Sequence, residues 1–355
     1  MADLPDEVQA NRVDKLPEIQ EAANEGWRHT KTAKGNRVNE LQKLAGLPRP
    51  VIDHGAKEEY GVIYMIYGRK HSAHLIASFM SLRSQWQGRV CFLCGDEQGL
   101  EVAEKLIALD KFENSFVQKF ERYKRKDYGR GTGYLTKTMM IDLSPFEYTV
   151  FLDADTIVTG SLTHMFPEVG GSEIVLTQFA DWTTQQRHIR KRLKSWEKSS
   201  PNEYTVCASY AMPALNTGVI GFSRLSVKFS KAWQEITKRN VSFICDEIGA
   251  QLAFYNHPHR IERDLYNASP IYSWKWLEAD VENFEATGEY LTAKIIHGHG
   301  NKLVKRPTGQ RIYLPFTQDL WDNDTAGFRE YAKANKQWKV HYIPVLSGKR
   351  KPLQK

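Results

Sequence analysis

Two aspartates at the end of an apolar run carry the most specific chemical signal in this sequence. Asp153 and Asp155 directly follow residues 148–152, a run of aromatic, β-branched and aliphatic residues typical of a buried strand. In an extended segment, residues at i and i+2 lie on the same side of the chain. Two buried carboxylates repel each other unless a cation neutralises them, and oxygen ligands suit Mg²⁺ or Mn²⁺. The pattern indicates a divalent-metal site, with a strand-end turn carrying two solvated aspartates as the alternative.

A second polar group follows the short apolar run 295–296 near the end of the chain. His297 can complete the ligand shell of a metal, and Gly298 and Gly300 let the backbone approach a phosphate closely. Lys302 adds a compact positive charge. A cation beside these groups can bridge the two phosphates of a diphosphate and stabilise its negative charge as it leaves. The alternative is a glycine-rich turn with an ordinary surface histidine.

The elements that must position these residues alternate between strand and helix patterns. Strands are expected at 62–67, 89–94, 115–120 and 148–152, and helices at 74–83 and 100–109. This alternation predicts an α/β domain with a twisted, mostly parallel sheet flanked by helices. Ligands of such sheets bind beyond the carboxyl ends of the strands, which is where Asp153 and Asp155 stand.

Composition narrows the class of protein. Of 355 residues, 41% are apolar and 26% are charged, which suits a packed domain rather than a disordered chain. The 49 Lys and Arg exceed the 42 Asp and Glu, so the net charge is +7, which favours anionic partners such as nucleotides or nucleic acid. No run reaches the roughly 18 apolar residues of a membrane helix, and the first 60 residues lack the apolar block of a signal peptide. We expect no integral membrane segment and a cytoplasmic location, in a bacterium or a virus-infected cell.

The four cysteines argue against a disulfide scaffold and for a reducing compartment. Cys91 and Cys94 have the CxxC spacing but lie within the expected strand 89–94. Residues three apart on a strand face opposite sides, so we interpret both as core residues rather than a zinc knuckle.

Three motifs together resemble nucleotide-sugar-dependent glycosyltransferases with the GT-A fold. Segment 151–158 resembles their DxD segment, and segment 215–222 resembles the asparagine–glycine strand of glycosyltransferase family 8, the glycogenin and galactosyltransferase group. Segment 297–302 is similar to the HxxGxxK close of that group. The resemblance covers about residues 61–305. The chain departs from the group in a polar insertion at 181–212 and after Lys302, where Leu303-Val304 replaces Pro-Trp.

The resemblance implies a role for each matching position. The implied metal ligands are Asp153, Asp155 and His297. The implied donor-binding residues are Lys137, Asp153, Gly300 and Lys302. The implied catalytic positions are Asn216, near the transferred sugar, and Asp246 and Glu247, an acidic pair at the start of a helix beneath it.

These roles describe transfer of a sugar from a nucleotide sugar, expected to be a UDP-sugar, to an acceptor hydroxyl with Mn²⁺ or Mg²⁺ as cofactor. The resemblance implies retention of the anomeric configuration. Inversion would instead require a general base, for which Asp246 and Glu247 are the nearest candidates. The alternative for this pair is a stabilising interaction with the helix dipole.

Two basic stretches, 119–130 and 187–198, flank the expected site and bear on the acceptor. Such runs are usually solvated surfaces, but they can also follow a phosphate backbone, with Trp182 and Trp196 available to stack on an exposed base. We therefore favour hydroxymethylated bases of viral DNA as acceptor, with a glycan, lipid-linked or protein acceptor as the alternative. The glycine-rich segment 129–133 suits a flexible lid over the donor phosphates.

Two hypotheses from other classes remain. One is a nucleic-acid-binding module that has kept the fold without transfer activity. The other is a zinc hydrolase built on His257, His259, His297 and His299, which lacks an HExxH spacing.

The chain is expected to fall into three parts. Residues 1–59 form a polar, partly helical arm, residues 60–305 the catalytic domain, and residues 306–355 an extension with a basic tail.

Overall fold

The computed structural model describes residues 59–270, 292–298, 320 and 323–334, with isolated positions 272, 273, 277, 279, 280, 283 and 287. The expected arm, apart from Glu59, lies outside the described residues. So do residues 299–305, which include Gly300 and Lys302, and the basic tail.

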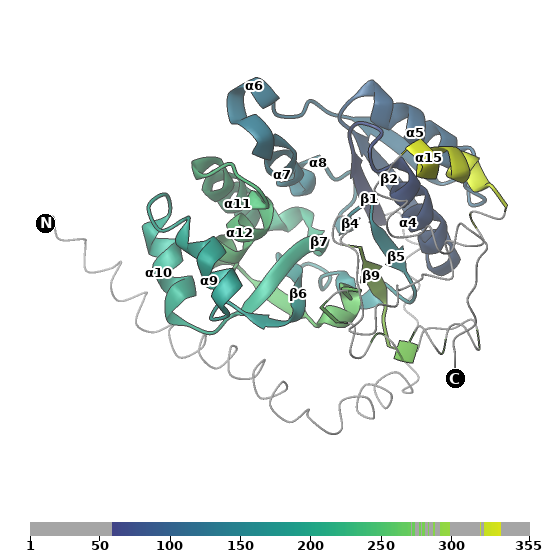
Figure 1. Cartoon of the computed structure of the whole chain (residues 1–355). Helices are drawn as coiled ribbons and strands as arrows, with labels where there is room; N and C mark the ends of the chain where they lie inside the picture. Colours follow the sequence, from purple (N-terminus) through teal and green to yellow (C-terminus); the bar gives the residue numbers. More distant parts are fainter. Residues whose placement is uncertain are drawn as a thin grey trace, which may run out of the picture.

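A seven-stranded sheet forms the centre of the described part of the molecule, in the order β3-β2-β1-β4-β7-β6-β8 (Figure 1). Its strands are β1 Tyr60–Ile66, β2 Arg89–Cys94, β3 Ser115–Lys119, β4 Tyr148–Leu152, β6 Ile174–Thr183, β7 Pro213–Ser223 and β8 His259–Glu262. Strands β3, β2, β1 and β4 run parallel to their neighbours, and β8 runs parallel to β6. Only β7 is antiparallel, to both β4 and β6. The expected mostly parallel sheet flanked by helices is confirmed.

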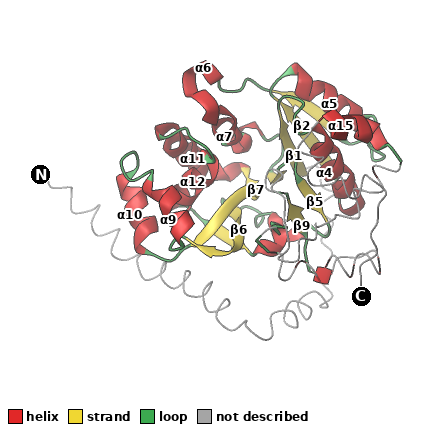
Figure 2. Cartoon of the chain, in the orientation of Figure 1, coloured by secondary structure: helices red, strands yellow, loops and turns green. Residues whose placement is uncertain are grey.

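Helices cover both faces of this sheet (Figure 2). One face carries α4 Ser72–Gln85, α5 Glu97–Ile107 and α15 Phe328–Ala334. Towards the other lie α6 Arg125–Tyr128, α7 Thr132–Lys137, α8 Met140–Leu143, α9 Arg187–Lys194, α10 Pro201–Ser209, α11 Val227–Arg239 and α12 Cys245–Ala253. Alternate strand residues enter the two apolar cores, as the period of two requires. Cys91 and Cys94 are buried in opposite cores, which confirms their reading as core residues.

A small second sheet brings the end of the domain back to the two aspartates. Strand β5, Thr156–Val158, pairs antiparallel with β9, Ile295–His297, with Thr156 opposite His297. The expectation that residues 153–155 are extended is wrong. The chain turns there, and the backbone N–H of Thr156 donates to the carbonyl of Asp153 at 3.2 Å. The turn still brings the two carboxylates together, since a ligand oxygen of each lies within 4.8 Å of the other.

The insertion 181–212 is an ordered part of the domain, containing the end of β6 and helices α9 and α10. Helix α9 buries Ile189 and Leu193, and Trp196 after it is only 1% exposed. The expectation that Trp196 can stack on a nucleic-acid base is therefore wrong, because its indole gains more from burial in the core beside α9. Segment 129–133 forms a short 3₁₀ turn and the beginning of α7. Among the described residues, no helix is both long and apolar enough to cross a membrane.

Candidate active site

The three expected metal ligands meet just beyond the carboxyl end of β4. The ligand atoms of Asp153, Asp155 and His297 all lie within 4.8 Å of one another. The Nε2 atom of His297 is 3.1 Å from Oδ1 of Asp155 and 3.7 Å from Oδ2 of Asp153. Carboxylate oxygens with an imidazole nitrogen suit Mn²⁺ or Mg²⁺, so the donor set fits the expected cation.

The charges of this group are unbalanced without a cation. Burial raises the pKa of Asp153, although Lys137 and His297 oppose the shift. Burial alone would lower the pKa of His297, but the neighbouring Asp155 and Asp153 outweigh it and raise that pKa. Negative charge between the two aspartates therefore attracts a proton, and a divalent cation would neutralise the same charge.

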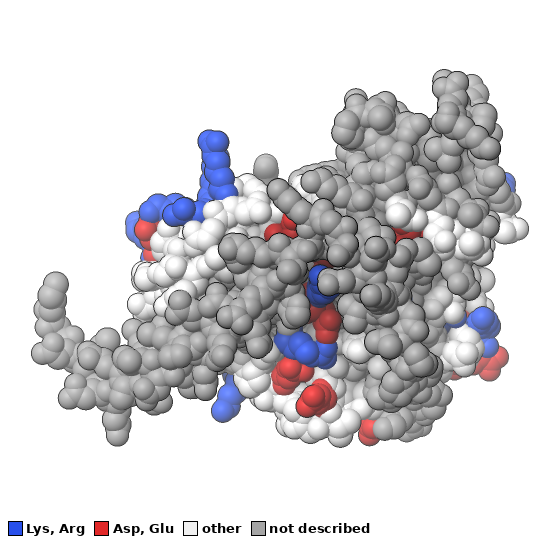
Figure 3. Space-filling model, turned by 90° about the horizontal axis from the view of Figure 1, so that it is seen from below, with Lys and Arg blue, Asp and Glu red and all other residues white. Residues whose placement is uncertain are grey.

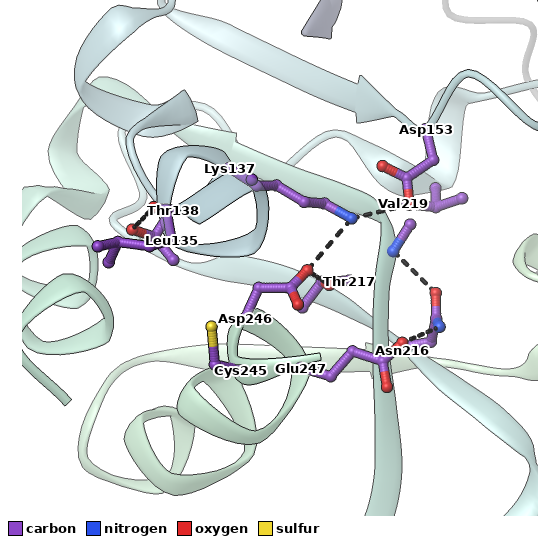
Figure 4. Close-up of polar contacts among 12 residues, drawn as sticks. Leu135, Lys137, Thr138, Asp153, Asn216, Thr217, Val219, Cys245, Asp246 and Glu247 are labelled. Atoms are coloured by element: carbon purple, nitrogen blue, oxygen red, sulfur yellow. Dashed lines mark hydrogen bonds and ion pairs between the residues drawn. The ribbon is translucent and has the colours of Figure 1, made fainter. Parts of the chain in front are cut away.

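Lys137, at the end of α7, joins this group to the acidic pair of α12 (Figure 4). Its Nζ atom lies 2.8 Å from Oδ2 of Asp153 and 3.4 Å from Oδ2 of Asp246, and the side chain is 12% exposed. Burial would lower the pKa of Lys137, but the two carboxylates raise it, so the ammonium stays charged. The hydroxyl of Thr217 also donates to Oδ2 of Asp246, at 2.7 Å. Asp246 thus serves as a buried anchor for Lys137.

The second acid of the pair, Glu247, faces a different set of partners. The amide nitrogen of Asn216 donates to its Oε1 at 2.8 Å, and Nη1 of Arg192 lies 3.7 Å from its Oε2. Burial, with the charge of Asp246, raises the pKa of Glu247 to about 7, against the opposing effect of Arg192. The sequence pattern does not distinguish Asp246 from Glu247. In the structure, Asp246 contacts Lys137 and Thr217, whereas Glu247 contacts Asn216 and Arg192.

Helix α12 begins in a strained turn. Ile244, directly before it, has φ 55° and ψ 31°, in the left-handed region that β-branched residues rarely enter. Such a residue costs on the order of 1–3 kcal/mol and persists where the surrounding structure demands it. Here the turn fixes where the first turn of α12, with Asp246 and Glu247, lies against β7.

Residue 218, which follows Asn216 and Thr217 in β7, must be glycine for a steric reason. A Cβ atom on Gly218 would lie 2.1 Å from Cε1 and 2.5 Å from Nδ1 of the His297 ring. Contacts this short do not occur, so only glycine lets the His297 imidazole lie against β7. The motif and the distant histidine are therefore parts of one arrangement.

Comparisons with known proteins give similarity in structure alone. No protein-family model matches the chain, and no curated protein matches it in sequence. The structure is similar to solved glycosyltransferases. These include mouse xyloside xylosyltransferase 1 in its apo form (14% identity, 69% of this chain and 99% of that chain, TM-score 0.48). They also include the galactosyltransferase LgtC in complex with donor and acceptor sugar analogs (13% identity, 77% and 95%, TM-score 0.49).

A third similar structure is the glycosyltransferase GlyE of Streptococcus pneumoniae TIGR4 (13% identity, 79% of this chain and 64% of that chain, TM-score 0.45).

A large cavity lies beside the site, beyond the carboxyl ends of β1, β2 and β3. Its volume is about 1180 Å³, ample for a nucleotide. The guanidinium of Arg122 lies over the ring of Tyr67, 5.6 Å from its centroid, and the hydroxyl of Tyr67 donates to the carbonyl of Gly133 at 2.8 Å. The lining residues are Tyr67, Gly95, residues 119–126, Gly129, Thr132, Gly133 and Thr136. Segment 129–133 thus forms part of the cavity wall.

Two residues of the site were missed by the sequence reasoning. Asn267 is fully buried, and its Oδ1 lies 2.8 Å from Nδ1 of His297. No motif marks Asn267, which stands in an ordinary polar segment. Arg192 was noticed only as one cation among several in the basic stretch 187–198, and nothing in that pattern distinguishes it.

The zinc-hydrolase hypothesis is not supported by the arrangement of its histidines. His257 packs against the ring of Phe229, and His259 against Phe254, beside the edge strand β8. In the described part of the chain, the group able to hold a metal is Asp153, Asp155 and His297, without these two. His299 lies outside the described residues.

Proposed function

We propose that this chain is a metal-dependent glycosyltransferase that moves a sugar from a nucleotide sugar, a UDP-sugar, to an acceptor hydroxyl. One observation carries the proposal: Asp153, Asp155 and His297 place their ligand atoms within 4.8 Å of one another, beside a buried lysine. This donor set suits a diphosphate-bound Mn²⁺ or Mg²⁺, and the adjoining cavity of about 1180 Å³ has room for the nucleoside.

The metal end of the site would bind and orient the donor. Asp153, Asp155 and His297 would hold the cation, which when bound supplies positive charge for the departing diphosphate. Lys137 keeps Asp153 in place through its 2.8 Å contact and adds a cation that does not lose its proton. Gly300 and Lys302 remain predictions as diphosphate contacts.

The sugar end of the site offers Asn216 and Glu247. Because Lys137 and Thr217 both bind Oδ2 of Asp246, and its Oδ1 is buried, Asp246 is poorly placed to contact a substrate. Glu247, with a pKa of about 7, can exchange a proton near neutral pH. Retention, implied by the family resemblance, is tested by the anomeric configuration of the product, measured by NMR.

Helix α9 supports a polyanionic acceptor, and we favour DNA with hydroxymethylated bases. Arg187, Arg190 and Lys191 are exposed and form no ion pair within the described residues. Their helix reaches the site through Arg192, 3.7 Å from Glu247. Because the apolar side of α9 is buried, the helix has no apolar surface to insert into a bilayer.

Aromatic rings adjoin the cationic helix. The ring of Trp182 lies 3.9 Å from that of His188 and 4.5 Å from that of Tyr272, measured between centroids. Such a cluster suits stacking on a base or a sugar. In the view of Figure 3, Lys and Arg side chains project together from one edge, whereas acidic and basic side chains lie side by side near the centre.

The test is release of nucleoside diphosphate from a panel of nucleotide sugars, with Mn²⁺, with Mg²⁺ and with EDTA, each with and without hydroxymethylated DNA. Metal-dependent release that the DNA accelerates is the expected result. Metal-dependent release that ignores the DNA would keep the transferase and point to a glycan, lipid-linked or protein acceptor. Salt-sensitive DNA binding with no release from any donor would overturn the enzyme and favour the inactive binding module.

A further inference from the structure

A chain of hydrogen bonds, buried except at Glu247, connects the metal end of the site to its sugar end. It runs from His297 through Asn267 and Asn216 to Glu247, with successive distances of 2.8, 2.8 and 2.8 Å. Asn267, at its centre, is 0% exposed. The backbone around Asn267 is tied to β9, since the N–H of Ala268 donates to the carbonyl of Ile295, and the N–H of His297 to that of Ala268, both at 2.9 Å.

The partners of Asn267 fix which way its amide points. The hydroxyl of Thr177 lies within 3.1 and 3.2 Å of the carbonyls of Asn216 and Val219, so its proton is used there and its lone pair accepts from Nδ2 of Asn267 at 2.7 Å. Oδ1 of Asn216 already accepts from the backbone N–H of Gly218 at 2.8 Å. It is therefore an oxygen, and it also accepts from Nδ2 of Asn267.

With both protons of the Asn267 amide used, its Oδ1 faces His297. An amide oxygen only accepts hydrogen bonds, so Nδ1 of His297, 2.8 Å away, must carry a proton. The carboxylate of Asp155 likewise only accepts, and its Oδ1 lies 3.1 Å from Nε2, so without a metal that nitrogen carries a proton as well. A cation bound at Nε2 would replace that second proton and leave the Nδ1–H tautomer. This is the tautomer that a metal ligand at Nε2 requires.

We propose that Asn267 is a positioning residue that holds His297 in the Nδ1–H tautomer and, through Asn216, orients the Glu247 side chain. The metal-ligand geometry and the sugar end of the site would then be set by one directional chain of hydrogen bonds. The assignment of the sugar end rests on the proposed function, whereas the tautomer does not.

The direct test is ¹⁵N NMR of the His297 ring in the full chain labelled at histidine, with Mg²⁺ at one fixed concentration and above the measured pKa of that ring. A His297→Gln variant assigns the signal. We expect the Nδ1–H tautomer in the wild type and in Asn267→Asp, which keeps an acceptor facing His297. We expect a mixture of tautomers in Asn267→Leu. An Nε2–H tautomer in the wild type, or no change in Asn267→Leu, would overturn the proposal.

Binding of Mn²⁺ alone gives a second readout, which does not depend on turnover. Loss of a partner of this kind lowers metal affinity by about 10–100-fold, so Asn267→Leu should bind Mn²⁺ that much more weakly and Asn267→Asp much less so. Asn267→Asp still loses the donor to Asn216, so its kcat should fall while its Mn²⁺ affinity holds. Equal Mn²⁺ affinities in all three proteins would contradict the proposal.

A matched control separates these effects from general loss of stability. Ser144→Ala removes another buried hydrogen bond, 2.6 Å to Thr149, that has no link to the site. It should leave tautomer and Mn²⁺ affinity unchanged. If Asn267→Leu does not fold, the tautomer of His297 in the wild type still tests the proposal, because an Nε2–H tautomer there would overturn it. A chain with the Nδ1–H tautomer and tight Mn²⁺ that releases no nucleoside diphosphate would overturn the proposed function and leave this inference standing.

Discussion

The metal end of the site and the surface of α9 hold their charges in opposite ways. Lys137 is 12% exposed and lies between two carboxylates, whereas Arg187, Arg190 and Lys191 are exposed, without an ion pair in the described part of the chain. Buried charges interact strongly with their neighbours, and exposed charges are screened by water and salt. The first region can fix the geometry of a reaction, and the second can attract an anion from outside.

The largest expected effect is at the metal end, from Asp155→Asn. Removing a charged ligand from the group of three should lower kcat by about 10³-fold, or ~4 kcal/mol, and weaken Mn²⁺ binding in parallel. Nucleoside-diphosphate release and Mn²⁺ titration measure the two effects. The control is Glu168→Gln, which replaces an exposed acid and should change neither kcat nor Mn²⁺ binding. If Asp155→Asn released nucleoside diphosphate at the wild-type rate, and EDTA still stopped that release, the cation would have to bind elsewhere.

A smaller but still large effect is expected from Gly218→Ala. The added methyl would meet the His297 ring at about 2.1 Å, so the imidazole must move away from the two aspartates. We expect about a 10²-fold loss of kcat together with weaker Mn²⁺ binding, measured as for Asp155→Asn. Gly171→Ala, whose Cβ would lie 3.2 Å from the carbonyl oxygen of Glu168, is the matched control. Normal Mn²⁺ affinity in Gly218→Ala would show that the ring does not need this position.

These first two predictions concern the part of the site that the sequence predicted best. The run 148–152 coincides with β4, and the residue types of Asp153, Asp155 and His297 predicted a metal site where the structure brings their ligand atoms together. The pattern of a strand is local, so it can be read without the fold. The turn at 153–155 was missed because the pairing of β5 with β9, which creates it, joins segments far apart in the sequence.

The sugar end was predicted less well for the same physical reason. Asp246 and Glu247 are neighbours in sequence, and their different environments come from Lys137 on α7 and Arg192 on α9. Trp196 was taken for a surface residue because basic residues surround it in the sequence. Its burial depends on how α9 packs on the core, which the local pattern does not contain.

Glu247 lies between the metal end of the site and α9, and its raised pKa predicts that kcat depends on pH. With a pKa of about 7, Glu247 loses its proton as pH rises, so a step that uses its carboxylate should speed up through about pH 7 and level off above it. Arg192 stabilises the carboxylate, so Arg192→Gln should raise that pKa and move the rise to higher pH. Glu247→Gln should abolish the rise and slow kcat by about 10²-fold. A rise that stays in place in Arg192→Gln would contradict this role.

The smallest effect is expected on the exposed surface. Replacing Arg190 and Lys191 of α9 with Gln should raise the KM for a polyanionic acceptor several-fold and reduce the slope of log affinity against log salt by about 1–2. Donor hydrolysis without acceptor should not change. The control pair is Lys228→Gln with Lys231→Gln, two exposed lysines of α11. Equal effects of the two pairs would mean that net charge, rather than α9, attracts the acceptor.

The most direct measurement is the anomalous scattering of Mn²⁺ in crystals of the full chain grown with Mn²⁺ and UDP. We predict one Mn²⁺ within about 2–2.5 Å of Asp153, Asp155 and Nε2 of His297, with both phosphates of UDP bound to it. A diphosphate bound in the cavity with no Mn²⁺ at these three side chains, or a Mn²⁺ held by other residues, would contradict the proposed metal-dependent transfer.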